Sequence, residues 1–154
     1  AAAGESEGGI QAMLDDAAMA VMVLNGGSAV PLWNTWLDGL QEEAPEGEEI
    51  DVAGLKAIFA KALEELEDMS GAKVGDKTMM DALIPASEAV AAYTGDSADE
   101  LFDAAAQAAA QGAEATQQYV SKFGRAKSYG TKTIGTPDAG AVSMSWFFQG
   151  LARE

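Results

Sequence analysis

Three glycine-bearing segments of the chain carry the residue types needed to bind a phosphorylated ligand. Residues 26–33 read Gly-Gly-Ser-Ala-Val-Pro-Leu-Trp, and residues 75–81 read Gly-Asp-Lys-Thr-Met-Met-Asp. Residues 124–141 begin with Gly-Arg-Ala and end with Pro-Asp-Ala-Gly-Ala. Glycine lets backbone N–H groups approach an anion, and the free N–H groups at a helix start attract phosphate. Each segment alone is a weak signal, because glycine-rich loops are common.

The charge of the chain is unevenly distributed. Its net charge is −16, which argues against nucleic acid as a partner. Nevertheless, four of its nine basic residues fall between positions 122 and 132, and residues 116–136 contain no Asp or Glu. These four are Lys122, Arg125, Lys127 and Lys132. The pattern predicts a local anion site, with ordinary variation in a surface loop as the alternative.

Length and composition bound the class of protein. The 154 residues suit a single domain, 1–154, with residues 1–9 as a flexible end. Hydrophobic residues make up 48% of the chain and charged residues 22%, as in soluble globular proteins, and no apolar run suits a membrane span. The absence of Cys and His excludes disulfides, thiol catalysis and histidine chemistry within this chain. We expect a cytoplasmic protein with no membrane partner.

Apolar periodicity and capping residues predict six helices and no strand. Asp51 is expected to cap one helix, Ser97 to Glu100 form a capping box, and Asp138 is expected to cap the last helix. The alanine-rich helix after Ser97 is expected to pack closely on more than one side. Short connections favour an antiparallel, all-α bundle. The predicted helices are 10–24, 31–40, 52–70, about 75–93, 98–123 and 139–151.

In this order, and separated by helices, the three segments resemble the nucleotide-binding subunit of dihydroxyacetone kinase, from about Ile10 onward. The same domain forms the C-terminal half of single-chain kinases of this family. The resemblance implies an antiparallel eight-helix barrel, of which about six helices would be present here. It also implies binding of ADP or ATP and supply of the phosphoryl group to a triose held on a substrate-binding partner subunit. A phosphocarrier protein is a further implied partner, as an alternative to ATP exchange.

The resemblance also implies roles for particular residues. Alternatives come from position alone: Met79 and Met80 also suit a helix start in the core, and Asp138 also suits an N-cap. Lys77 and Asp81 are expected to be structural, four residues apart on one helical face. Ala29, Val30 and Ala139 depart from the family pattern of glycine, serine and proline. The implied nucleotide-binding residues are Gly26, Gly27, Ser28 and Ala29 at the phosphates, Gly71, Thr78 and Met79 near adenine and ribose, Arg125 at the phosphates, and Asp138, Ala139 and Gly140 at the nucleotide.

Members of the family hold two Mg²⁺ ions on an aspartate-rich loop, and this sequence has no such loop; Asp15 and Asp16 form a mid-helix pair. We therefore expect no catalytic or metal-binding residue in this chain, no phosphoryl transfer by the chain alone, and a longer parent protein that supplies the magnesium ligands. Two other functions stay open. One is a non-catalytic nucleotide-binding or regulatory module, and the other is the nucleotide domain of a fatty-acid kinase-like system.

Overall fold

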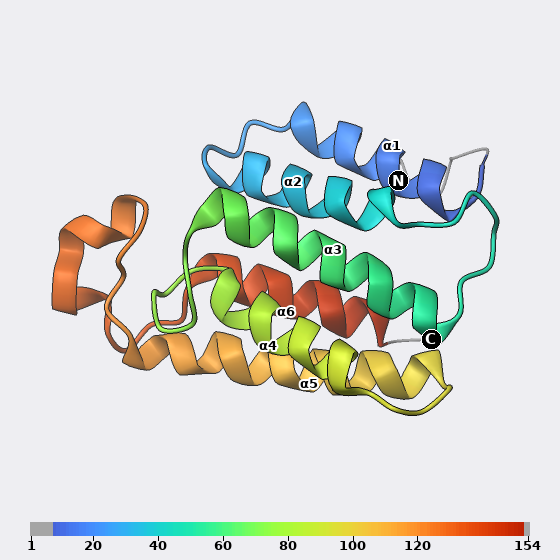
Figure 1. Ribbon diagram of the computed structural model, residues 1–154. Coiled ribbons are helices and arrows are strands. Elements are labelled where there is room, and N and C mark those ends of the chain that lie inside the picture. The colour runs from blue at the N-terminus through green and yellow to red at the C-terminus, as the bar shows by residue number, and fades with distance from the viewer. Residues whose placement is uncertain (1–7, 153–154) are drawn as a thin grey trace. The chain divides into compact units, whose positions relative to one another are not determined.

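The computed structural model describes residues 8–152, and every regular element in that range is helical (Figure 1). The prediction of an all-α helical bundle is confirmed. Most of the predicted flexible end at residues 1–9 lies outside the described range. None of the described helices combines the length and apolar character needed to cross a membrane. The chain forms two compact units, one ending at Gly71 and the other beginning at Ala72.

The first unit is a layer of three helices in which α2 contacts both α1 and α3 (Figure 1). The predicted apolar stripes form its core: the rings of Trp36 and Phe59 lie 6.1 Å apart, and both side chains are buried. Gly39 permits a close approach, because a Cβ there would lie 2.6 Å from the Cα of Ala62. The helices are α1 (Ile10–Met22), α2 (Ala29–Glu42) and α3 (Val52–Ser70).

The second unit is a bundle of three helices that all contact one another. These are α4 (Met80–Ala92), α5 (Ala98–Ala115) and α6 (Ala139–Leu151). The close packing expected of the alanine-rich helix is confirmed, because α5 contacts both neighbours. At one crossing, a Cβ on Gly112 would lie only 2.0 Å from the carbonyl oxygen of Asp81. Pro85 has no N–H to offer that carbonyl, so the α5 backbone can lie directly against it.

The predicted helix caps have mixed outcomes. Asp51 accepts a hydrogen bond from the N–H of Gly54 at 2.7 Å, which confirms it as the cap of α3. Ser97 accepts from the N–H of Glu100 at 3.3 Å, as a capping box requires. In a full capping box the Glu100 carboxylate would accept from the N–H of Ser97. Here it accepts instead from the Tyr93 hydroxyl at 2.8 Å. That hydroxyl in turn accepts from the N–H of Ser97 at 3.3 Å, so Tyr93 completes the cap.

Several predicted helix boundaries are wrong by two residues or more, including both ends of α2, which runs from Ala29 to Glu42 instead of 31–40. The first helix ends at Met22 rather than residue 24, and α4 begins at Met80 rather than near residue 75. The largest error concerns α5, which ends at Ala115 and not near residue 123. Two 3-10 segments follow it, η2 (Thr116–Gln118) and η3 (Arg125–Thr133).

Candidate nucleotide site

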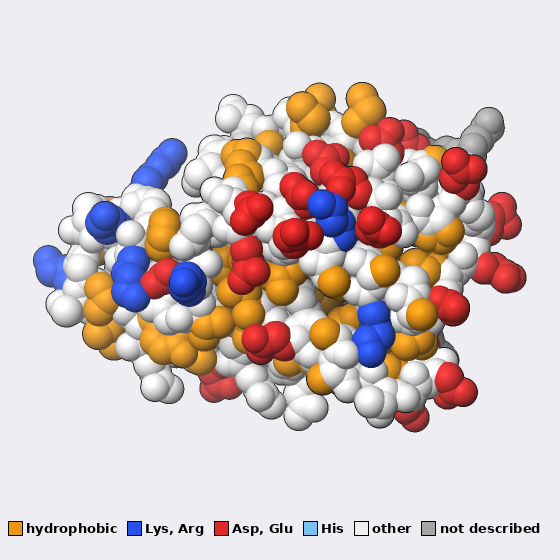
Figure 2. Space-filling model, viewed as in Figure 1, with side chains coloured by type: hydrophobic (Ala, Val, Ile, Leu, Met, Phe, Trp, Pro, Cys, Tyr) orange, Lys and Arg blue, Asp and Glu red, His pale blue; other side chains and the backbone are white. Residues whose placement is uncertain are grey.

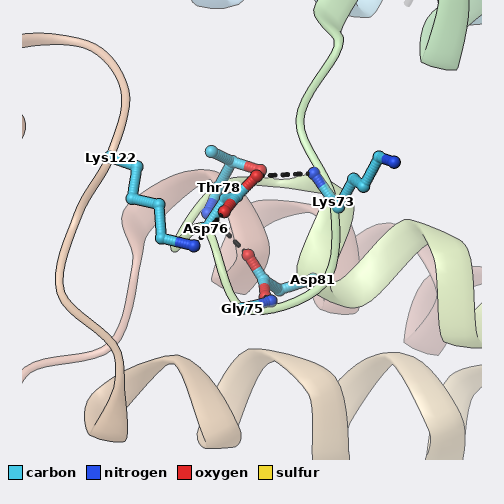
Figure 3. Close-up of polar contacts among 6 residues, drawn as sticks. All are labelled: Lys73, Gly75, Asp76, Thr78, Asp81 and Lys122. Carbon is cyan, nitrogen blue, oxygen red and sulfur yellow. Dashed lines mark hydrogen bonds and ion pairs between the residues drawn. The ribbon is translucent and has the colours of Figure 1, made fainter.

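The loop before α4 is held by two aspartates (Figure 3). Asp76 accepts from the N–H of Lys73 at 2.8 Å and forms an ion pair with the Nζ atom of Lys122 at 2.6 Å. Asp81, on the first turn of α4 and 1% exposed, accepts from the N–H groups of Gly75 at 2.6 Å and Thr78 at 2.7 Å. The Lys122 ammonium is the main cause of a lowered pKa at Asp76. The hydrogen bonds and the ion pair of these charged residues therefore fix the conformation of the loop.

Lys77 lies in this loop and not on a helical face, so the prediction that it pairs with Asp81 along a helix is wrong. Its backbone is left-handed, with φ of 62°, and α4 starts only at Met80. The side chain is buried, and its ammonium donates to the carbonyl oxygens of Thr116 at 2.6 Å, Thr133 at 2.7 Å and Thr136 at 2.6 Å. Lys77 therefore has the expected structural role in another form: it links the loop before α4 to the segment between α5 and α6.

The segment 116–136, which joins α5 to α6, carries the basic residues and is fixed to the first loop by Lys77 and Lys122. The N–H of Lys122 also donates to the carbonyl of Asp76 at 3.1 Å. Arg125 is exposed at the start of η3, immediately after Gly124, whose φ is 59°. In Figure 2 a group of lysine and arginine side chains gathers over the part of the second unit where Figure 1 draws η3, while others lie apart from it. The basic residues of this segment are therefore at the surface, and anion binding by them stays a prediction.

Asp138 closes this segment and begins α6. Its carboxylate accepts from the N–H of Ala141 at 2.9 Å, which confirms the predicted N-cap, and its own N–H donates to the Thr116 hydroxyl at 2.8 Å. Burial is the main cause of a raised pKa at Asp138, and the nearby carboxylate of Asp81 adds to the rise.

Two groups of predicted site residues meet in the second unit. A Cβ on Gly140 would lie 3.3 Å from the Cβ of Met79 and 3.4 Å from its backbone nitrogen. Met79 is 5% exposed, which fits the core interpretation of its position, while Thr78 is half-buried and Ala139 is exposed. The structure therefore brings Thr78 and Met79 together with the start of α6. A contact of Met79 with a base stays a prediction.

The remaining predicted residues belong to the first unit. Gly26, Gly27 and Ser28 are exposed between α1 and α2, Ala29 is exposed as the first residue of α2, and Gly27 has a left-handed φ of 62°. Val30 lies inside α2 and needs no left-handed backbone, so the departure from the family's glycine costs no strain there. Gly71 ends α3 in the left-handed conformation, with φ of 62°. Their contact with a nucleotide stays a prediction.

No local sequence pattern indicates the contacts that hold the two loops together. Lys77 reaches acceptors 39, 56 and 59 residues further along the chain, and Lys122 reaches back 46 residues to Asp76. The available signal was the placement of the basic residues. Six of only nine lie in the two loops: Lys73, Lys77, Lys122, Arg125, Lys127 and Lys132. Within residues 8–152, no group of three or more acidic residues lies close enough to hold a metal ion.

Comparison with known proteins gives a consistent result. The model of the DAK2 domain family matches residues 1–153. The L-erythrulose kinase of Pectobacterium atrosepticum is 36% identical over 96% of this chain and 25% of its own length. The D-erythrulose kinase of Mycolicibacterium smegmatis is 34% identical over 94% of this chain and 26% of its own. The ADP-binding subunit of a PEP-dependent dihydroxyacetone kinase from Listeria innocua is 30% identical over 94% and 67%. The chain thus spans about a quarter of the first two relatives.

Proposed function

Because this chain belongs to the DAK2 domain family, we propose that it is the nucleotide-binding part of a dihydroxyacetone-type kinase. One observation carries the proposal: the Thr78–Met79 loop and the Asp138–Gly140 helix start lie together, beside a basic segment, in a chain with a net charge of −16. A relative named as an ADP-binding subunit supports the choice of an adenine nucleotide.

In the proposed complex, each group of residues has a chemical role. Arg125 donates charge-assisted hydrogen bonds to phosphate oxygens, for which its planar guanidinium is suited. Met79 and Thr78 border the base and the ribose, since a methionine side chain adapts to a flat ring. The N–H groups near the start of α6 face the anionic part of the ligand, and the resemblance assigns the same role to the N–H groups near the start of α2. The residues concerned at these helix starts are Gly26, Gly27, Ser28, Ala29, Asp138, Ala139 and Gly140, with Gly71 near the ribose.

The proposed phosphoryl acceptor is a short-chain ketose. Relatives named as erythrulose and dihydroxyacetone kinases support this class of acceptor. The ketose would be held by a separate substrate-binding part, either a partner subunit or another domain. Magnesium, when bound, would neutralise charge on the phosphate oxygens during transfer. We place the protein in the cytoplasm, where adenine nucleotides are abundant, and leave ATP and a phosphocarrier protein as the two proposed phosphoryl donors.

The test combines binding with turnover. Calorimetric titration of the chain with ADP is expected to give saturable binding, and AMP is expected to bind more weakly because it lacks the β-phosphate. The protein, together with its substrate-binding part, is then assayed with dihydroxyacetone and with erythrulose. Binding of ADP without phosphorylation of either ketose would favour a regulatory module. Failure to bind any adenine nucleotide would overturn the proposal.

A further inference from the structure

The structure assigns a positioning role to Lys77, and this inference goes beyond the proposed function of the loops that it joins. We propose that the Lys77 ammonium clamps the segment 116–136 in the shape that presents Arg125, and that it donates no hydrogen bond to the ligand. A lysine two residues after Gly75 and directly before Thr78 invites the opposite interpretation, that of a direct phosphate ligand.

The geometry of the ammonium carries the first step. A lysine ammonium has three N–H donors, and three carbonyl oxygens accept from it at 2.6 to 2.7 Å. Each donor therefore has an acceptor within the protein. The side chain is 5% exposed, so the ammonium is also shielded from solvent. A phosphate would have to displace one of these carbonyls to reach it.

The positions of the three acceptors carry the second step. Thr116 and Thr136 stand at the two ends of the segment, and Thr133 ends η3. A single ammonium thus joins the points where the segment leaves α5 and where it returns to α6. The bonds from Asp138 to the Thr116 hydroxyl and from Gly135 to the Gln117 carbonyl, at 2.8 and 2.7 Å, hold the same closure. These amides therefore report whether the segment is closed.

The backbone at Lys77 carries the third step. Among residues 8–152 it is the only non-glycine residue with a positive φ, a conformation that costs free energy for an L-residue. Such strain persists where the surroundings over-determine the conformation. The three side-chain hydrogen bonds supply that constraint. The Lys77 charge also acts on the carboxyl of Asp138, whose pKa it lowers in opposition to burial.

The chain offers a specific test because it contains no cysteine. In K77C the single thiol can be alkylated under denaturing conditions with 2-bromoethylamine. Its sulfur then displaces bromide, and the product carries an ammonium at nearly the lysine position. Alkylation with iodoacetamide gives a matched neutral side chain. K73C, at an exposed position in the same loop, is the control for the treatment.

Amide hydrogen exchange without nucleotide is measured at Gly135, at Asp138 and at Ser121, whose N–H donates to the Thr133 hydroxyl at 3.0 Å. We expect roughly tenfold faster exchange in the neutral K77C adduct, in line with the loss of a hydrogen-bonded contact, and wild-type rates in the aminoethyl adduct. Amides of α4 and α5 show whether the bundle itself is intact. K77Q, which keeps two N–H donors, is measured alongside in case the neutral adduct does not fold. Unchanged exchange in both neutral variants would overturn the clamp.

Measurements of ADP binding distinguish this inference from the proposed function. The effect of Lys77 on ADP affinity rests on the proposed function, whereas the clamp itself does not. If wild type binds ADP, the neutral adduct is expected to bind roughly tenfold more weakly, and aminoethylation is expected to restore affinity. Loss of ADP affinity with unchanged amide exchange would identify Lys77 as a direct ligand and overturn the positioning role. Faster exchange with unchanged ADP affinity would also overturn the positioning role, because the shape of the segment would then not matter for binding. If wild type binds no ADP, the proposed function fails, while the exchange data still decide whether the clamp exists.

Discussion

At the residue scale, Lys77 and Arg125 have different roles, although both are residue types that can bind an anion. The Lys77 ammonium is buried and its three donors point to carbonyl oxygens, whereas Arg125 is exposed on the segment 116–136. Residue type alone does not separate a clamp from a ligand. Burial and the identity of the acceptors do.

Arg125 is therefore expected to contribute directly to binding. Changing Arg125 to Ala should weaken ADP binding by about 1.5–3 kcal/mol, the usual worth of a hydrogen bond to a charged group. Calorimetry on both proteins measures this difference. Lys127→Ala, which removes an exposed positive charge from the same segment, is the matched control and should have a smaller effect. Equal ADP affinities for wild type and R125A would rule out the role of Arg125.

Asp138 is expected to make stability depend on pH in an unusual direction. Its folded-state pKa is raised, chiefly by burial, so the folded protein holds this proton more tightly than the unfolded chain. The stabilisation from its protonation is therefore lost as pH rises from the ordinary pKa of 3.8 through the raised one. D138N keeps an N-cap and removes the titration. Urea unfolding should show the wild-type stability falling relative to D138N as pH rises through that window. A relative rise would contradict the assignment.

At the element scale, the packing of α5 on α4 also supports the loop. The position of Gly112 against the Asp81 carbonyl fixes the start of α4, and the Asp81 carboxylate holds the N–H groups of Gly75 and Thr78. Asp81 therefore takes part in both contacts: its carbonyl packs against α5, and its carboxylate holds the loop.

Gly112→Ala tests this link. The added Cβ would lie 2.0 Å from the Asp81 carbonyl oxygen, so α4 and α5 must move apart. We expect a loss of about 1–3 kcal/mol in the free energy of unfolding, the usual cost of overpacking. Gly150→Ala on α6 is the control, because a Cβ there meets nothing within 4 Å, and it should be neutral or slightly stabilising. Chemical denaturation compares the two variants, and similar stabilities for both would contradict the close contact.

The sequence predicted those elements whose causes are local. Asp51, Ser97 and Asp138 were identified as caps because a cap bonds to N–H groups within three residues. The end of α5 was not predicted, because the Thr116 carbonyl bonds to Lys77 and the Thr116 hydroxyl accepts from Asp138. Likewise, the candidate site residues could be chosen by type and resemblance, while the clamp at Lys77 depends on partners far along the chain.

At the scale of the whole molecule, the net charge of −16 repels ADP while the segment 116–136 attracts it. Salt screens both effects, with a Debye length of about 10 Å at 0.1 M ionic strength. The basic residues lie close to the proposed phosphate position and many of the acidic ones do not, so we expect the local attraction to dominate. ADP affinity should therefore fall as salt increases, as calorimetry at several ionic strengths can show. Affinity that rises with salt would mean that the net charge dominates.

The most direct test of the central claim is a titration of the isotope-labelled protein with ADP, followed by amide chemical shifts with and without Mg²⁺. If the DAK2-family chain binds an adenine nucleotide through the proposed residues, saturable shifts should concentrate at Gly26 to Ala29, Gly71, Thr78 to Met79, Arg125 and Asp138 to Gly140. Small shifts at the middle of α3 serve as the internal reference. Absence of saturable shifts under both conditions, or shifts centred elsewhere, would contradict the account.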